Sequence, residues 1–171
     1  MCGIAGMYWS GSRPSGAESA VNRMVRAIHH RGPDSDGRAS NGFSEVGFKR
    51  LAIIDLSSGD QPLANEDGSV ECFLNGEIYN YRSLRDDLIK RGHMFRTTSD
   101  TEVLPHLYEE YREGMFAKLN GMFSIVVIDH RRQSVLLARD QFGVKQLYYA
   151  QTPQGIVFAS EVKAILASGL V

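Results

Sequence analysis

Residues 122–139, MFSIVVIDHRRQSVLLAR, contain two β-type segments joined by a short polar connection. The segments at 122–129 and 134–139 are rich in apolar and β-branched residues, which favour strands. So short a connection is typical of an antiparallel hairpin, because parallel strands need a crossover of a dozen or more residues. The segments at 146–150 and 156–159 repeat this arrangement. The carboxyl-terminal part of the chain is therefore predicted to form antiparallel sheet.

Helices and further strands precede these hairpins. Apolar residues at helical spacing predict helices at 17–28 and 82–91, and a capping-box pattern opens a third helix at 99–113. Pro105 costs that third helix about 3 kcal/mol unless it lies in the first turn. Since the strands cluster and do not alternate with helices, the predicted class is α+β with mainly antiparallel sheets. The other predicted elements are strands at 4–9, 45–54 and 70–74 and a short helix at 161–167.

Composition and charge exclude several classes of protein. A chain of 171 residues is long enough for one domain with its own core. Lys and Arg (19) balance Asp and Glu (20), so nothing indicates a nucleic-acid or anionic-membrane partner. The apolar run at 123–128 is far shorter than the roughly 18 residues of a transmembrane helix. Two cysteines form neither a disulfide framework nor a four-cysteine zinc site, so we expect a cytoplasmic globular domain.

Cys2 is the first candidate catalytic residue. Removal of Met1 would leave Cys2 with a thiol and a free α-amine on the same residue. An α-amine has a pKa of about 7.7–8.0, so it can act as the base for its own side chain. Cysteine is equally a small apolar residue suited to the start of a buried strand. Position alone leaves both roles open.

Polar residues elsewhere offer the remaining parts of an acyl-transfer site. The Asn75 amide and the Gly76 N–H can donate to a developing oxyanion, although Asn-Gly is also an ordinary turn. Arg50 is either a surface charge or a bidentate partner for a substrate carboxylate. Glu77 and Asp100 are either a turn acid and a helix-cap acid or, together, a site for a substrate ammonium group.

Eight motifs place these residues in a known family. They are MCGIAG (1–6), HRGPD (30–34), KRLAIID (49–55), LNGEIYNY (74–81), SDTE (99–102), LNGMF (119–123), RDQFGVK (139–145) and ASEVKA (159–164). In content and order they make the chain similar to the glutamine-hydrolysing domain of class II, or N-terminal-nucleophile, glutamine amidotransferases. Among these it resembles most closely the domain of glutamine-hydrolysing asparagine synthetases.

The resemblance implies a fold and a reaction. The fold is a four-layer αββα sandwich of two stacked sheets, that of the N-terminal-nucleophile hydrolases. Cys2 would attack the side-chain carboxamide of glutamine, with its own α-amine as the base. Asn75 and the Gly76 backbone would form the oxyanion hole. The γ-glutamyl thioester would release ammonia and then be hydrolysed to glutamate.

The resemblance also implies how the substrate is held. Arg50 would bind the α-carboxylate of glutamine, and Glu77 and Asp100 would bind its α-ammonium group. Backbone groups of three further residues would line the pocket, namely Leu51, Ile53 and Ile54.

The expected domain context follows from the same family. Residues 1–171 correspond to one glutamine amidotransferase type 2 domain, slightly truncated, and we expect the synthetase domain to be absent. ATP and magnesium belong to that synthetase domain, and we expect no cofactor for this one. L-Glutamine and a carboxyl-terminal synthetase domain are the expected partners, without nucleic acid or membrane, and a homodimer stays open. There are two alternatives. One is the same glutaminase chemistry feeding a different amide-forming synthetase, and the other is a catalytically silent regulatory module that retains Met1.

Three positions depart from the family's pattern. Phe48 replaces a common histidine, Pro105 an aliphatic residue, and Gln146 a typical proline.

The pair His29-His30 resembles a pair of metal ligands, but Cys, Asp and Glu partners at ligand spacing are missing. No metal site is therefore expected from the sequence.

Overall fold

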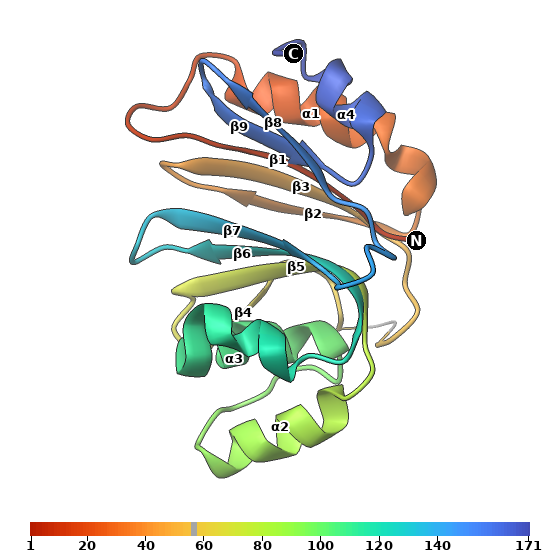
Figure 1. The fold of residues 1–171 in the computed structure, drawn as a ribbon, viewed down its shortest axis with the longest axis vertical. Coiled ribbons are helices and arrows are strands. Elements are labelled where there is room, and N and C mark those ends of the chain that lie inside the picture. The colour runs from red at the N-terminus through yellow and green to blue at the C-terminus, as the bar shows by residue number, and fades with distance from the viewer. Residues whose placement is uncertain (56–57) are drawn as a thin grey trace.

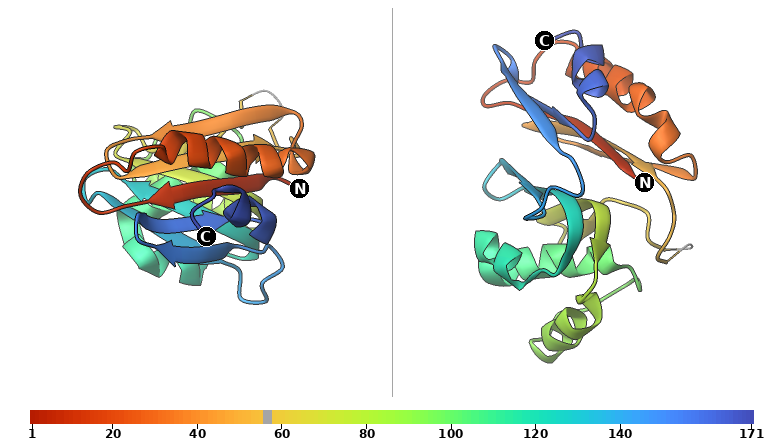
Figure 2. Two further views of the ribbon diagram at one scale, coloured as in Figure 1. Left: turned by 90° about the horizontal axis from the view of Figure 1, so that it is seen from above. Right: turned by 45° about the vertical axis from the view of Figure 1, so that its right-hand side comes forward.

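The computed structural model describes residues 1–55 and 58–171, which form two antiparallel sheets lying face to face with helices outside both (Figures 1 and 2). The strands are β1 (Gly3–Tyr8), β2 (Ser35–Ser40), β3 (Ser44–Arg50), β4 (Leu63–Ala64), β5 (Val70–Ile78), β6 (Gly121–Asp129), β7 (Ser134–Arg139), β8 (Tyr148–Thr152) and β9 (Gly155–Ala159), and the helices are α1 (Ala17–Ala27), α2 (Tyr81–Lys90), α3 (Val103–Tyr111) and α4 (Val162–Ala167). One sheet has the strand order β2-β3-β1-β9-β8, and the other has the order β4-β5-β6-β7. The predicted α+β class and the αββα sandwich are confirmed.

Helices α1 and α4 cover the outer face of the five-stranded sheet (Figure 1). The predicted apolar stripe of α1 is buried, and its residues Val21 and Met24 pack with Met7 of β1 and Val157 of β9. Helix α1 ends at Ala27, and a 3₁₀ turn follows, as the basic residues and glycine after it predict.

Besides the core between α1 and the five-stranded sheet, a second apolar layer lies between the two sheets. Phe48 of β3 and Phe73 of β5 meet there with ring centroids 5.7 Å apart, and both are fully buried. Val126 of β6 belongs to this layer, whereas its neighbours Ile125 and Val127 face the helices on the other side. Successive side chains of a strand point to opposite faces, so the unbroken apolar run of β6 reflects burial on both. Phe48, which stands where the family commonly has a histidine, therefore lies in apolar surroundings that suit its ring.

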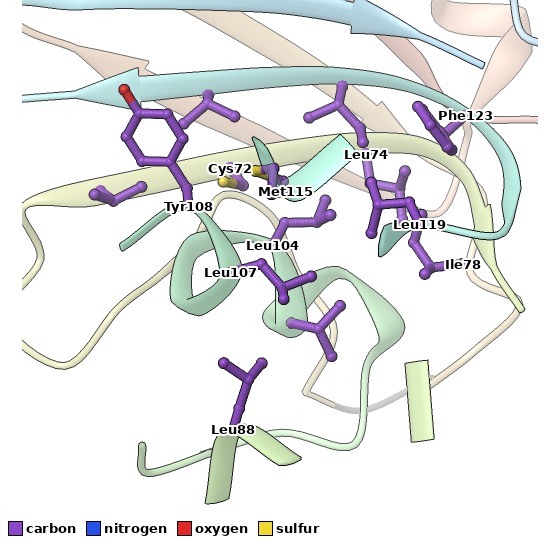
Figure 3. Close-up of a cluster of buried hydrophobic side chains, with 14 residues drawn as sticks. Cys72, Leu74, Ile78, Leu88, Leu104, Leu107, Tyr108, Met115, Leu119 and Phe123 are labelled. Atoms are coloured by element: carbon purple, nitrogen blue, oxygen red, sulfur yellow. The ribbon is translucent and has the colours of Figure 1, made fainter. Parts of the chain in front are cut away.

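Helix α3, with α2 beyond it, covers the outer face of the four-stranded sheet. Figure 3 shows Leu104 of α3 pointing toward the sheet and Leu107 pointing toward Leu88 of α2 below it. Cys72 lies in this core, fully buried, so its thiol serves packing. Pro105 is in the first turn of α3, where no helical hydrogen bond is lost.

In the described part of the chain, no helix is both long and apolar enough to cross a membrane.

Several predicted boundaries are wrong, and two of the differences shape the active site. β3 was expected to run to residue 54 but ends at Arg50, because the chain curls around the Arg50 side chain, which hydrogen-bonds to the Ile54 and Asp55 carbonyls. β5 was expected to end before Asn75, but pairing with β6 carries it on to Ile78. Strands β2 and β4 were not predicted, since β2 is polar and β4 has two residues.

Candidate active site

One pocket at the start of β1 brings together every site residue predicted from the sequence. Its volume is about 210 Å³. Its walls come from the start of the chain, the segment after β3, the end of β5 and the 3₁₀ turn Asp100–Glu102. The predicted residues among those that line it are Cys2, Arg50, Leu51, Ile53, Ile54, Asn75, Gly76, Glu77 and Asp100.

Cys2 is held from both its backbone and its side chain. Arg31 Nε donates to the Cys2 carbonyl at 2.8 Å, and Arg31 is itself paired with Glu161 at 2.8 Å. The Cys2 Sγ accepts a hydrogen bond from the Leu51 N–H at 3.3 Å. Burial raises the pKa of the Cys2 thiol, although the Leu51 N–H and the positive charges of the chain's amino terminus and Arg50 act against it. Since the thiolate is the nucleophilic form of cysteine, this thiol would need a base in order to react.

Asn75 and Gly76 present hydrogen-bonding groups from within β5. The Asn75 side chain is buried: its Nδ2 donates to Ser124 Oγ on β6 at 3.3 Å, and its Oδ1 has no partner among residues 1–55 and 58–171. A serine hydroxyl both donates and accepts, so Ser124 can hold either end of the amide. A buried amide atom without a partner costs free energy until a ligand satisfies it. Gly76 has φ of +150°, and a Cβ there would overlap the Met122 carbonyl, so glycine is required.

Arg50 gives the pocket a cationic end. Its side chain is almost completely buried, and its Nη1 lies 3.0 Å from Asp60 Oδ1. Its Nη2 donates to the Ile54 carbonyl at 3.3 Å and to the Asp55 carbonyl. These contacts fix the plane of the guanidinium group, which is the group suited to a carboxylate.

Glu77 and Asp100 make another part of the pocket acidic. Asp100 Oδ2 accepts the Ile78 N–H at 2.9 Å, which fixes the carboxylate next to the end of β5. Burial raises the pKa of Asp100 to about 6, and the nearby charge of Glu77 adds to this effect despite the hydrogen bond from Ile78. A bound cation would offset both causes, so these carboxylates suit an ammonium group.

Three supporting residues were missed or undervalued by the sequence analysis. Gln61 Oε1 accepts the Leu74 N–H at 2.6 Å, and its Nε2 donates to Thr101 Oγ1 at 3.1 Å, so it ties β5 to the Asp100 turn. No sequence pattern marks Gln61. Ser124 could have been noticed, because it is the one polar residue in the apolar run at 123–128. Arg31 belongs to the HRGPD motif, but nothing in that motif indicates its contact with Cys2.

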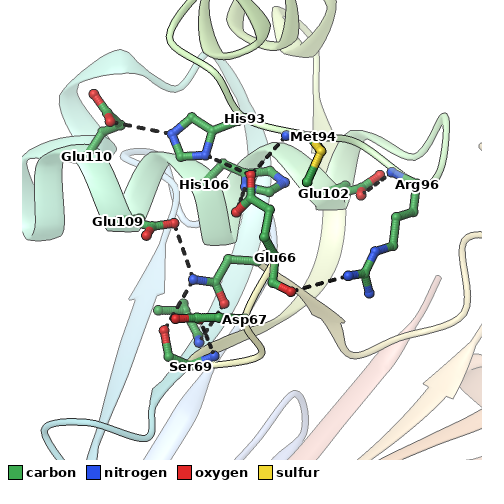
Figure 4. A network of polar contacts seen from close by, with 12 residues as sticks. Glu66, Asp67, Ser69, His93, Met94, Arg96, Glu102, His106, Glu109 and Glu110 are labelled. Atoms are coloured by element: carbon green, nitrogen blue, oxygen red, sulfur yellow. Dashed lines mark hydrogen bonds and ion pairs between the residues drawn. The ribbon is translucent and has the colours of Figure 1, made fainter.

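Metal-ligating side chains gather elsewhere in the described ranges. Glu66, His93, His106 and Glu109 form such a group, and none of the four lines the active-site pocket (Figure 4). His29 and His30 do not belong to it. His30 Nε2 lies 3.0 Å from Glu161 Oε1.

Two solved structures share the fold. The glutamine phosphoribosylpyrophosphate amidotransferase of Bacillus subtilis, complexed with ADP and GMP, has a TM-score of 0.79 over 98% of this chain and 44% of that chain, at 22% identity. A structure described as the allosteric regulatory enzyme of purine biosynthesis also has a TM-score of 0.79, over 98% of this chain and 43% of that one, at 23% identity. At these identities the likeness concerns the fold alone.

Curated relatives are more similar in sequence. Asparagine synthetase [glutamine-hydrolyzing] 2 of Bacillus subtilis (strain 168) is 42% identical over 170 residues, which are 98% of this chain and 22% of that protein. Asparagine synthetase [glutamine-hydrolyzing] 3 of Arabidopsis thaliana is 43% identical over 166 residues, 96% of this chain and 28% of that protein. The chain thus spans about a quarter of the length of these relatives. A family model described as a glutamine amidotransferase domain matches residues 1–171, and the chain therefore belongs to the glutamine amidotransferase domain family.

Proposed function

We propose that this chain hydrolyses L-glutamine to glutamate and ammonia through a thioester on Cys2. One observation carries the proposal: a single pocket is lined by a thiol, a buried side-chain amide, a guanidinium group and two carboxylates. Glutamine presents the matching groups, which are an electrophilic carboxamide, an α-carboxylate and an α-ammonium. Membership of the glutamine amidotransferase family supports the same substrate.

The reaction divides into acylation and hydrolysis at Cys2. After Met1 is removed, the α-amine of Cys2 takes the thiol proton, and the sulfur attacks the carboxamide carbon. The negative charge that develops on oxygen is stabilised by the Asn75 side chain and the Gly76 N–H. As the C–N bond breaks, the amine returns a proton to the leaving nitrogen, which departs as ammonia. Water then attacks the thioester, giving glutamate and the free thiol.

The other residues hold the unreactive end of glutamine. Arg50 binds the α-carboxylate, and Glu77 and Asp100 bind the α-ammonium. Because these groups fix both charges of the amino acid, they place the carboxamide against Cys2. Backbone groups of Leu51, Ile53 and Ile54 complete this wall of the pocket.

In the longer protein, we propose that the ammonia passes to a carboxyl-terminal synthetase domain. The names of the relatives support an asparagine synthetase, in which ATP and magnesium would act at that domain. The steps assigned to the present chain use neither. The alternative is a synthetase that transfers the ammonia to a different acceptor. The glutaminase steps would be the same in both cases. A cytoplasmic location, where ATP and glutamine are available, fits both.

The direct test uses a preparation whose amino terminus is Cys2, verified by intact mass. Incubated with L-glutamine, it should release glutamate and ammonia in equal amounts. L-Asparagine is the matched control substrate, because its side chain is one methylene shorter and its carboxamide should not reach Cys2 when both α-groups are bound. A processed chain that releases no glutamate would contradict the proposal.

Asn75→Ala should lower kcat by about 10²–10³, the usual cost of one oxyanion-hole donor. KM for glutamine should change much less, because the donor acts mainly on the transition state. Steady-state kinetics of the processed protein separate the two constants. Asn22→Ala, at an exposed position on α1, is the control and should retain the parent's constants. An effect of Asn75→Ala confined to KM would remove Asn75 from the oxyanion hole.

Glutamine affinity should fall as the pH is lowered through about 6. Only ionised Asp100 attracts the α-ammonium group, and its raised pKa of about 6 means that protonation begins just below neutrality. The measurement is the Kd of glutamine by calorimetry between pH 5 and 8 on the Cys2→Ala variant, in which no turnover interferes. Asp100→Asn in the same background should bind weakly and lose this pH dependence, whereas Asp87→Asn on α2 should keep it. An unchanged pH profile in Asp100→Asn would exclude Asp100 as the titrating group.

A further inference from the structure

A group of histidine and glutamate side chains lies beside α3, and none of its members lines the active-site pocket. Glu66 comes from the turn between β4 and β5, His93 follows α2, and His106 and Glu109 lie three residues apart on α3. Each offers a ligand atom, and these four atoms all lie within 4.8 Å of one another. Figure 4 shows the Glu66 carboxylate between the rings of His93 and His106.

His106 is the member of this group that packing alone does not explain. It is 1% exposed, and in the described ranges neither of its ring nitrogens has a hydrogen-bond partner. Its Nδ1 lies 3.3 Å from Glu66 Oε2 without hydrogen-bonding geometry. Buried polar groups are nearly always paired, because leaving one without a partner costs free energy. A buried imidazole that faces a carboxylate and a second imidazole has the surroundings of a metal ligand.

We propose that Glu66, His93, His106 and Glu109 form a binding site for Zn²⁺. Two imidazole nitrogens and two carboxylate oxygens are a donor set that suits zinc, which prefers four ligands at about 2.0–2.2 Å in a tetrahedron. In such a tetrahedron the ligand atoms are about 3.4 Å apart. The four atoms, already within 4.8 Å of one another, need only a small contraction of their side chains to reach that spacing.

The hydrogen bonds around the four residues support this assignment. A zinc-bound histidine usually places its second ring nitrogen against a carboxylate, which fixes the orientation of the ring. His93 Nε2 lies 3.4 Å from Glu110 Oε1, and Glu110 is in turn held by Arg91 at 3.1 Å. The other ring nitrogen of His93, Nδ1, therefore faces Glu66 and lies 3.1 Å from Glu66 Oε1.

The two carboxylates are oriented in the same way. Asn65 Nδ2 donates to Glu109 Oε2 at 3.2 Å, and the Met94 N–H donates to Glu66 Oε1 at 2.9 Å. Zinc at this position would join α3, the segment after α2 and the β4–β5 turn. The 3₁₀ turn that carries Asp100 runs directly into α3, so the ion would also steady the acidic wall of the active site.

The test measures Zn²⁺ binding to the full chain in the Cys2→Ala background. That background removes the amine–thiol chelate that Cys2 would offer to zinc. The protein is stripped with a chelator, and Zn²⁺ is titrated in competition with a chromophoric chelator. We expect one equivalent to bind, a rise in Tm with Zn²⁺, and, with Co²⁺ instead, the visible absorption of a four-coordinate site.

Two ligand variants and one matched control make the result specific. His106→Gln and His93→Gln should each weaken Zn²⁺ binding about 100-fold or more, since loss of an outer-shell partner alone costs 10–100-fold. His130→Gln should bind like the parent, because His130 faces a glutamate, Glu71 at 2.8 Å, but lies outside the group. Circular dichroism verifies folding, and His93, at the edge of the group, decides the matter if His106→Gln does not fold. Absence of stoichiometric binding, or equal affinity in His93→Gln and the parent, would show an ion-pair network only.

Discussion

Replacing Cys2 by alanine is expected to reduce ammonia release from glutamine by about 10⁶-fold, to the level of the assay background. This is the size of loss found when a catalytic nucleophile is removed and only binding and the oxyanion hole remain. In the proposed reaction every step after substrate binding passes through the Cys2 sulfur, so no other group can carry part of the rate. Glutamine should still bind, because its charged ends meet Arg50, Glu77 and Asp100.

The fold should tolerate this change, and the second cysteine provides the control. The Cys2 side chain is half-buried and contacts the Leu51 backbone, so alanine removes one sulfur contact just before the start of β1. Cys72→Ala should keep full activity but unfold at a lower temperature, since Cys72 is buried in the core under α3.

A diazo-ketone analogue of glutamine distinguishes the two thiols directly. It should alkylate Cys2 and spare Cys72, as peptide mapping by mass spectrometry would show. Burial raises the pKa of Cys72 well above its ordinary value, and Cys72 does not line the active-site pocket. Turnover in Cys2→Ala, or labelling at Cys72, would mean that the nucleophile has been misassigned.

Much of the fold could be predicted because the pattern of apolar and polar residues in its main elements matches their burial. β7 was predicted with its observed limits, and β6 within one residue, since polar connections and apolar segments mark both ends. β2 has the sequence SDGRAS, whose residue types favour no strand, and it forms because β3 offers it a partner over six residues. Such pairing depends on tertiary structure, which a single segment does not encode.

The site was predictable by motif and not by local pattern. Asn75-Gly76 has the composition of a turn, yet it continues β5, because β6 pairs with it and glycine accepts the φ of +150°. The zinc-ligand group shows the limit most clearly. Its histidines and glutamates come from three separate segments, and only packing of the β4–β5 turn against α3 brings them together.

The position of Cys2 suits the proposed reaction, in which the α-amine takes the place of a separate catalytic histidine. β1 lies between β3 and β9 in the five-stranded sheet, so the strand that follows Cys2 is held on both sides. Arg31 fixes the Cys2 carbonyl at 2.8 Å, leaving the side chain and the amine side of the residue toward the pocket rim. A nucleophile and a base on one residue are oriented together by this single anchoring.

A chain that retains Met1 is expected to be folded and without glutaminase activity. With Met1 attached, the nitrogen of Cys2 is an amide, which cannot accept the thiol proton. Met1 also lines the pocket, and its sulfur lies 2.9 Å from Lys145 Nζ at the rim. The thiol then keeps the raised pKa that burial gives it, and it is protonated at neutral pH.

Removing the extension should restore activity by placing the α-amine on Cys2. The test compares two preparations of the same sequence, one with an uncleavable residue before Cys2 and one cleaved to expose it, each verified by intact mass. Thiol alkylation rates between pH 6 and 10 should follow a lower apparent pKa in the cleaved form, and this pKa belongs to the amine–thiol pair. Glutamate release should appear only there, and cleavage of the Cys2→Ala chain should restore nothing. Equal glutaminase activity in the extended and cleaved forms would show that a group other than the α-amine removes the proton from Cys2.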